Sequence, residues 1–246
     1  MKRVALPLLV AVCALAIARQ VFTYRDKSGS LTVRARSGLV EQQANNRVHL
    51  ELRGSPVVLT SSTDGLTLNA PAIVCDAITK GKTTIEKAVG TGGLTALKSA
   101  ASGNTTITSS SGSYTAGAQP KLILSGSVKI VDRTTTRTTT ITGRNGTALL
   151  EPGSKGPGSG LRRATLSGPV RVEAVQQNTT GGRIIATGSR LEVDNVAHVV
   201  TLTGNVNVTG NQASTLGELH GADKAVLVLN SKGEVSSVRV SQGASQ

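Results

Sequence analysis

The three histidines are the first residues to consider for metal or acid–base chemistry, because neutral imidazole is a common metal ligand. His49, His198 and His220 are far apart, and no cysteine or second histidine lies at a metal-ligand spacing from any of them. His220 and Asp223 lie within reach of each other in the sequence, but one such pair does not make a zinc site. We therefore predict no metal centre, and we expect the histidines to lie at the surface or to be hydrogen-bonded.

The carboxylates and the one nucleotide-like motif do not form a recognisable catalytic set. Glu192 and Asp194 are expected on one face of a strand, whereas a glycosidase needs two carboxylates across a cleft. Gly81-Lys82-Thr83 resembles the end of a P-loop, but Asp76 stands where the first glycine belongs. No Gly-x-Ser-x-Gly nucleophile motif occurs in the chain. The sequence thus predicts a protein that is not an enzyme and that carries no cofactor.

The charge balance favours an anionic partner. The chain has 27 basic and 14 acidic residues, a formal net charge of +13, which suits phospholipid headgroups or a phosphorylated glycolipid. Nucleic acid is also anionic, but proteins that bind single strands stack bases on aromatic side chains. The only aromatic residues are Phe22, Tyr24 and Tyr114. We therefore predict no nucleic-acid partner.

The N-terminus has the composition of a targeting segment. Lys2 and Arg3 precede an uncharged apolar run from Val4 to Ala18, shorter than the roughly 20 residues of a typical membrane-spanning helix. We expect residues 1–20 to be a signal peptide or an N-terminal membrane anchor, and the rest of the chain to be exported. Beyond this segment Cys75 is the single cysteine, so we expect no intramolecular disulfide and interpret Cys75 as a small buried apolar residue.

The rest of the chain has the pattern of an all-β protein. Alternating apolar residues recur from Leu31 onward at intervals typical of strands separated by turns, and no long amphipathic segment suggests a helix. Two stretches fall outside this pattern. We interpret residues 19–30 as a linker and residues 80–104, rich in Gly and Lys, as an irregular insertion that holds at most one short helix.

A repeated phrase carries most of the alternation. Leu, Gly and two later aliphatic residues recur at the same spacing from Leu124, Leu166 and Leu202, and a blurred copy begins at Leu52. The alternation predicts strands with one buried face, and the glycine predicts a repeated bend or bulge. The starts are spaced unevenly, by 42 and 36 residues, which favours hairpins of variable length over a strict solenoid coil.

The segment 183–240 resembles the OstA-like family of lipopolysaccharide-transport periplasmic proteins, of the LptA and LptC type. The resemblance rests on Gly188-Ser-Arg-Leu-Glu-Val193, on Leu202-Thr-Gly-Asn-Val-Asn-Val208, and on Gly221-Ala-Asp-Lys-Ala225 with the strand after it. It implies an elongated, open-ended β-jellyroll of stacked antiparallel strands over residues 21–246. It also implies a periplasmic location, either soluble or anchored in the inner membrane.

The resemblance further implies a function and its residues. Jellyrolls of this family hold the acyl chains of lipopolysaccharide and stack edge to edge into a bridge, so the expected partners are lipopolysaccharide or a related glycolipid and other jellyroll transport proteins. The candidates for an aliphatic lipid groove are Leu124, Val128, Ile130, Leu166, Val170, Val172, Leu202, Val206 and Val208. The candidates for binding headgroup phosphates are Lys121, Lys129, Arg162, Arg163, Arg171 and Arg190.

A structural or adhesive β-solenoid at the cell surface is the alternative. It rests on the same repeat together with the abundance of Thr, Ser, Gly and Asn. It predicts an interior closed and filled by side chains, whereas a lipid carrier predicts an open apolar groove.

Overall fold

The computed structural model describes residues 21–153, 160–177, 182–211, 218–230 and 235–241. These residues form fourteen β-strands and no helix; accordingly, none of them belongs to a helix of the length and apolarity needed to cross a bilayer. The strands are β1 (Phe22–Arg25), β2 (Leu31–Ala35), β3 (Ser37–Gln43), β4 (Arg47–Ser61), β5 (Leu66–Ile78), β6 (Thr84–Ala100), β7 (Gly103–Thr115), β8 (Lys121–Thr134), β9 (Arg137–Leu150), β10 (Leu161–Gln176), β11 (Arg183–Asp194), β12 (Val199–Gly210), β13 (Leu219–Leu229) and β14 (Val235–Ser241).

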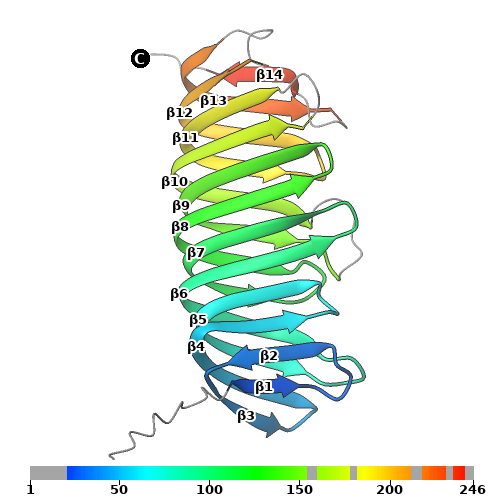
Figure 1. Ribbon diagram of the computed structural model, residues 1–246. Helices are drawn as coiled ribbons and strands as arrows, with labels where there is room; N and C mark the ends of the chain where they lie inside the picture. Colours follow the sequence, from blue (N-terminus) through cyan, green and yellow to red (C-terminus); the bar gives the residue numbers. More distant parts are fainter. Residues whose placement is uncertain (1–20, 154–159, 178–181, 212–217, 231–234, 242–246) are drawn as a thin grey trace, which may run out of the picture.

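All strands belong to one antiparallel sheet. From β4 to β14 each strand pairs with the next along the chain, while β2 and β3 both pair with β4, and β1 pairs with β2. The sheet does not close into a barrel: β1 and β3 lie at one end of the stack and β14 at the other (Figure 1). The predicted all-β, elongated and open-ended jellyroll is confirmed.

The long strands bend in their middles, and at each bend every second strand carries a bulge. In β8, Ser125 and Val128 pair with Asn145 and Gly143 of β9, so β8 carries one residue more than its partner between them. The same excess occurs in β6, β10 and β12, and β4 carries two extra residues. The glycines of the repeated phrase lie at these bulges with φ of 71°, 90° and 77°, a region that favours glycine. The predicted repeated bend is confirmed.

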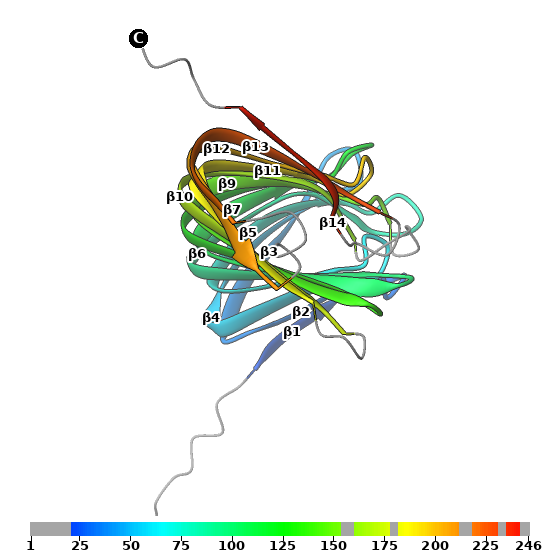
Figure 2. The same ribbon diagram turned by 90° about the horizontal axis from the view of Figure 1, so that it is seen from above.

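The bends fold the sheet into two arms that face each other, seen along the stack in Figure 2. We call arm A the half that contains β2 and the turns at residues 62–65, 101–102 and 135–136. Arm B is the half that contains β3 and the turns at residues 79–83, 116–120 and 195–198. The side of the molecule where the turns of the two arms meet is called the seam.

The uneven spacing of the phrase has a direct structural cause. The copies lie in β4, β8, β10 and β12. One strand and two turns separate successive copies in β8, β10 and β12, and the lengths of both strands and turns set the interval. The extra residue lies in every second strand because, if two paired strands each had one, the two residues would pair with each other and no bulge would form.

The structure corrects two expectations about irregular segments. Residues 80–104 are not an irregular insertion, because Thr84–Ala100 forms β6, a regular strand with its bulge at Gly92 and Gly93. The segment 19–30 is not simply a linker, because Phe22–Arg25 forms β1. In both segments, glycines or polar residues interrupt the alternation of apolar and polar side chains. Pairing with a neighbouring strand nevertheless holds the segment in a strand.

Aliphatic side chains from both arms meet between them and form one core. Leu50, Leu59, Ile73 and Leu122 are fully buried, and the burial alternates along long strands such as β4 and β8, as a two-sided sheet requires. Cys75 is also fully buried, as expected, and burial raises the pKa of its thiol to about 12.

Candidate functional site

The described residues contain no cluster of three or more side chains able to hold a metal ion. His49 nevertheless has carboxylate partners that the sequence did not reveal: its Nδ1 lies 2.7 Å from Asp76 Oδ1 and its Nε2 lies 3.6 Å from Glu51 Oε1. The pairing of His49 with Asp76 across β4 and β5 creates this contact. The hydrogen bond to Asp76 raises the pKa of His49, although its partial burial acts in the opposite direction.

The nine groove candidates all lie on the inner face of the sheet. Each is buried, with at most 6 % of its surface exposed. The pairing aligns them in rows across the stack: Leu166 and Leu202 both lie beside Leu191, and Val172 and Val208 both lie beside Ala186. The sequence pattern therefore identified the inner face correctly.

Over most of its length this inner face is filled by its own side chains and forms no open groove. From β4 to β9 the inward aliphatic residues, such as Leu59, Ile85 and Ile130, have at most 2 % of their surface exposed. Buried Tyr114 adds aromatic bulk to the same region. This filled interior is what a close-packed protein core requires.

Most of the headgroup candidates lie away from this inner face. Lys129 and Arg171 are exposed and alternate with buried residues of β8 and β10, so they project from the outer face, as does the exposed Lys121. Arg190 of β11 is exposed and pairs with residues that flank the bulges of β10 and β12. A lipid whose acyl chains lay between the arms would therefore not place its headgroup near these side chains.

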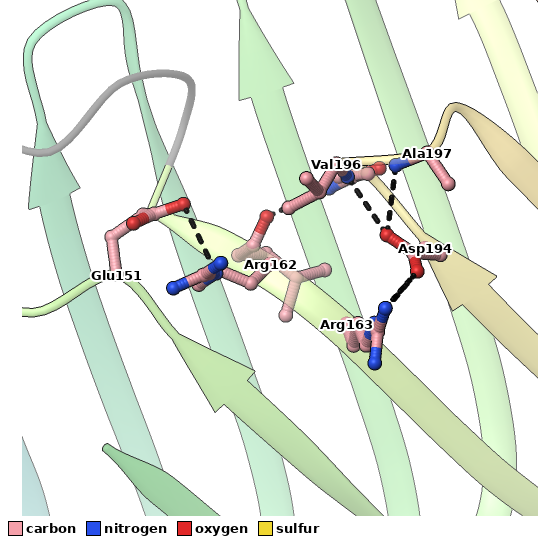
Figure 3. A network of polar contacts seen from close by, with 8 residues as sticks. Glu151, Arg162, Arg163, Asp194, Val196 and Ala197 are labelled. Carbon is pink, nitrogen blue, oxygen red and sulfur yellow. Dashed lines mark hydrogen bonds and ion pairs between the residues drawn. The ribbon is translucent and has the colours of Figure 1, made fainter. Parts of the chain in front are cut away.

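Arg162 and Arg163 instead belong to a network of ion pairs near the seam, drawn in Figure 3. Arg162 Nε lies 3.7 Å from Glu151 Oε1, and Arg163 Nη2 lies 2.6 Å from Asp194 Oδ2. Asp194 Oδ1 also accepts hydrogen bonds from the backbone N–H groups of Val196 and Ala197, both at 2.9 Å. These contacts shape the turn after β11 and link it to the start of β10.

Polar contacts join the two arms along the seam. Near the N-terminal end, Thr83 Oγ1 of arm B donates to Asp26 Oδ2 at 2.8 Å, and Thr83 N donates to Ser30 Oγ at 2.7 Å. Asp26 and Ser30 belong to the turn before β2, on the arm A side. The first part of the seam is thus closed by a buried hydrogen-bond network.

Two further contacts close the seam along the stack. The ammonium group of Lys98, on arm A, donates to the carbonyl oxygens of Asp64 and Gly153, and Gly153 belongs to the turn on arm B. Farther along, Asn195 of arm B reaches Asp132 Oδ2 of arm A at 3.5 Å and the Leu161 carbonyl at 2.9 Å. Lys98 is almost fully buried, and this burial lowers its pKa despite the nearby carboxylates.

Beyond Asn195 the two arms enclose a small pocket near the C-terminal end of the stack. Its volume is about 40 Å³. Aliphatic side chains from both arms form most of its lining, and Arg137, Thr139, Gln176 and Asn195 contribute the polar part. The aliphatic lining residues are Val172, Ala174, Ile184, Ala186, Val193, Val200, Leu227, Leu229 and Val235. We call this space the C-terminal pocket.

Two features distinguish the C-terminal pocket from the filled centre. Thr139 is 8 % exposed, and its buried Oγ1 has no hydrogen-bond partner, an arrangement that costs free energy unless a ligand or water satisfies it. Burial also lowers the pKa of the Arg137 guanidinium, although Asp132 opposes this effect. The pocket therefore combines an apolar wall with a cationic group and an unsatisfied hydroxyl.

Comparison with known proteins identifies no relative. No family model matches the chain, and neither a curated protein nor a solved structure matches it.

Proposed function

We propose that this protein is a non-catalytic periplasmic lipid-binding component, similar in role to lipopolysaccharide-transport proteins, and that it binds an acyl chain at its C-terminal pocket. The observation that carries the proposal is the composition of that pocket: aliphatic side chains from both arms beside a half-buried arginine and an unpartnered threonine hydroxyl. An acyl chain suits the aliphatic wall, and a phosphate or carboxylate suits the guanidinium.

The end of the stack supplies a reason for placing the lipid there. Ile184 and Val200 each retain 8 % exposure, whereas inward residues in the centre retain almost none. Among the residues that the structure describes, β14 pairs with β13 alone and contributes only to arm B. With about 40 Å³ available, well below the roughly 300 Å³ of the smaller ligand pockets, binding requires β13 and β14 to move away from arm A.

Burial of an acyl chain supplies a favourable free energy that opposes the cost of this movement. Each methylene buried contributes about 0.8 kcal/mol, so a chain of about ten methylenes gains roughly 8 kcal/mol before entropy costs.

Site-specific photo-crosslinking in cells tests the proposal. A photoreactive residue at Val172 or Val200, both in the pocket lining, is expected to form a covalent adduct with a glycolipid or phospholipid. Ile123 is the matched control, an aliphatic residue on the outer face with 48 % exposure, and should give no lipid adduct. Absence of an adduct from both pocket positions would contradict the proposal.

The partners we propose besides lipid are other jellyroll proteins that add to the ends of the sheet. Within the described residues, β14 pairs on one side only, as do β1 and β3 at the opposite end. Exposed strand edges of this kind accept a further strand. A photoreactive residue at Ser241 of β14 should capture a second jellyroll chain, and a monomer alone at every concentration would count against stacking.

A structural β-solenoid at the cell surface is the second candidate, and the filled interior from β4 to β9 favours it. Protease treatment of intact cells separates the two. A periplasmic lipid-binding protein is shielded by the outer membrane and should be cleaved only after that membrane is permeabilised, whereas a surface protein is cleaved at once.

A further inference from the structure

The N-terminal end of the stack holds a second recess, on the opposite side of the sheet from the lipid-binding interior. It is an open cleft of about 820 Å³, much larger than the C-terminal pocket. The cleft is lined by Val21, Arg34, Ala35, Arg36, Ser37, Arg53, Gly54, Ser55, Pro56 and Val58. Among the described residues, three arginines and no acidic residue line it, and we call it the arginine cleft.

The bulge of β4 creates this cleft. Between Arg53 and Val57, β4 has two residues more than β5 has between Ala72 and Ala70. On its other side β4 meets the junction of β2 and β3, where the Arg36 N–H donates to the Arg53 carbonyl at 3.0 Å. A Cβ at Gly54 would lie 2.8 Å from the Arg36 nitrogen, so only glycine permits this approach.

This backbone arrangement brings the three arginines into the lining of one cleft. Arg36 and Arg53 are joined by that hydrogen bond, and Arg34 pairs with Val58 just beyond the bulge. All three side chains are exposed, and within the described residues none of them forms an ion pair. The nearest carboxylate along β4, Glu51, is turned to His49. The positive charge of the cleft is therefore not neutralised by the protein itself.

The position of the cleft in the chain indicates what it meets. Val21 lines the cleft, and only Arg19 and Gln20 separate it from Ala18, the last residue of the apolar N-terminal run. Three residue steps span about 10 Å of extended chain, comparable with the Debye length of about 8 Å at physiological ionic strength. An apolar run held in a bilayer thus places the arginine cleft at the lipid headgroups.

We propose that the arginine cleft docks the N-terminal end of the jellyroll onto a membrane surface by binding the phosphate groups of anionic lipids. Arginine suits this task because its planar guanidinium binds phosphate oxygens in pairs. The aliphatic side chains of Val21 and Val58 and the ring of Pro56 in the same lining suit the apolar part of a headgroup region. This docking is independent of acyl-chain binding at the opposite end of the stack.

Vesicle binding by the full-length chain tests the proposal. The vesicles contain either phosphatidylcholine alone or phosphatidylcholine with 30 % phosphatidylglycerol. Insertion of the apolar run contributes to binding of both kinds of vesicle, so the ratio of the two affinities measures the charge-dependent part of binding. The test variant is Arg34→Gln/Arg36→Gln/Arg53→Gln. The matched control, Lys87→Gln/Arg144→Gln/Lys224→Gln, removes the same charge from exposed positions elsewhere. Circular dichroism confirms that both variants are folded.

The expected result is a loss of about fivefold per cleft arginine, about 100-fold for all three, on vesicles with phosphatidylglycerol. Binding to phosphatidylcholine alone should not change, and the control should lose much less. An equal loss of vesicle binding in the cleft variant and the control variant would mean that only net charge matters, which would overturn the proposal. Unchanged vesicle binding by the cleft variant would also overturn it. Full displacement by millimolar inorganic phosphate would also overturn it, since the site would then bind a soluble anion. Lipid adducts at Val200 report on the separate pocket and are expected from both variants.

Discussion

Replacing the bulge glycine of β12 with alanine tests the two-arm fold at the point where the repeated phrase creates it. Gly204 has φ of 77°, and a Cβ there would lie 2.7 Å from Ser189 Oγ and 2.9 Å from Ser189 Cβ. Gly221, in β13, has a similar φ of 67° but no atom within 4 Å of its added Cβ. The two substitutions share the backbone strain, and only Gly204→Ala adds a steric contact.

The magnitudes follow from these two effects. A positive φ costs a residue with a Cβ about 1–2 kcal/mol, which is the whole expected loss for Gly221→Ala. Overpacking a close contact adds typically 1–3 kcal/mol, so Gly204→Ala is expected to lower the free energy of unfolding by about 2–5 kcal/mol. Adding Ser189→Gly to Gly204→Ala removes the clashing atoms and should recover the steric part only.

Urea unfolding of the wild type, Gly204→Ala, Ser189→Gly and the double variant Ser189→Gly/Gly204→Ala gives the double-mutant cycle. Gly221→Ala is measured beside it. We expect a coupling free energy of at least about 1 kcal/mol between positions 189 and 204. Equal losses for Gly204→Ala and Gly221→Ala, with no coupling, would refute close packing at the bulge and leave only the backbone argument.

Three further predictions concern titration and the core. Burial raises the pKa of Asp26, but hydrogen bonds from Ser28, the Leu31 N–H and Thr83 outweigh this effect and lower the pKa to about 2. Relative to Asp26→Asn, the wild type should therefore hold about 2 kcal/mol of additional stability above pH 4 and lose it between about pH 4 and 2. Urea unfolding at several pH values measures this loss. Because the pKa of His49 is raised in the folded state, its contribution is full below the unfolded pKa of about 6.5 and lost as pH rises through the folded value; the melting temperature of the wild type minus that of His49→Gln should be larger at pH 5.5 than at pH 9, and an unchanged difference would contradict the pairing. Leu202→Ala, at a position with no exposed surface, should cost about 2–5 kcal/mol in chemical denaturation, and a loss below 1 kcal/mol would contradict the filled interior.

The sequence was most informative where a pattern is local. The alternation around Leu124, Leu166 and Leu202 predicted the strands, their buried face and the bend, because a two-residue period and a glycine with positive φ act within a few residues. The same local criterion failed for β6, where Gly90, Gly92 and Gly93 interrupt the alternation. Pairing with β5 and β7 holds that strand in register, and such pairing is not visible in the strand's own residues.

The candidate site was less accessible to sequence reasoning. Lys129 and Arg171 were selected as basic residues near strand ends, yet the alternation that buries Val128 and Val170 turns these side chains outward. The two-residue period of the strands thus separates the inward aliphatic residues from the outward basic residues. Arg137 and Thr139 were missed because they belong to a Thr-rich stretch whose contact with β13 and β14 across the C-terminal pocket exists only after the sheet has bent.

By itself, the sequence determined that this chain is all-β, that its strands bend at repeated glycines and that its inner face is aliphatic, because each of these properties depends on neighbouring residues and the backbone period. Only the tertiary structure decided that the interior is filled along most of its length, that Asp26, Lys98 and Asp132 lie where polar contacts join the arms, and that Arg34, Arg36 and Arg53 share one cleft. Those outcomes depend on residues tens of positions apart, and their distances are set by how two arms of one sheet close on each other.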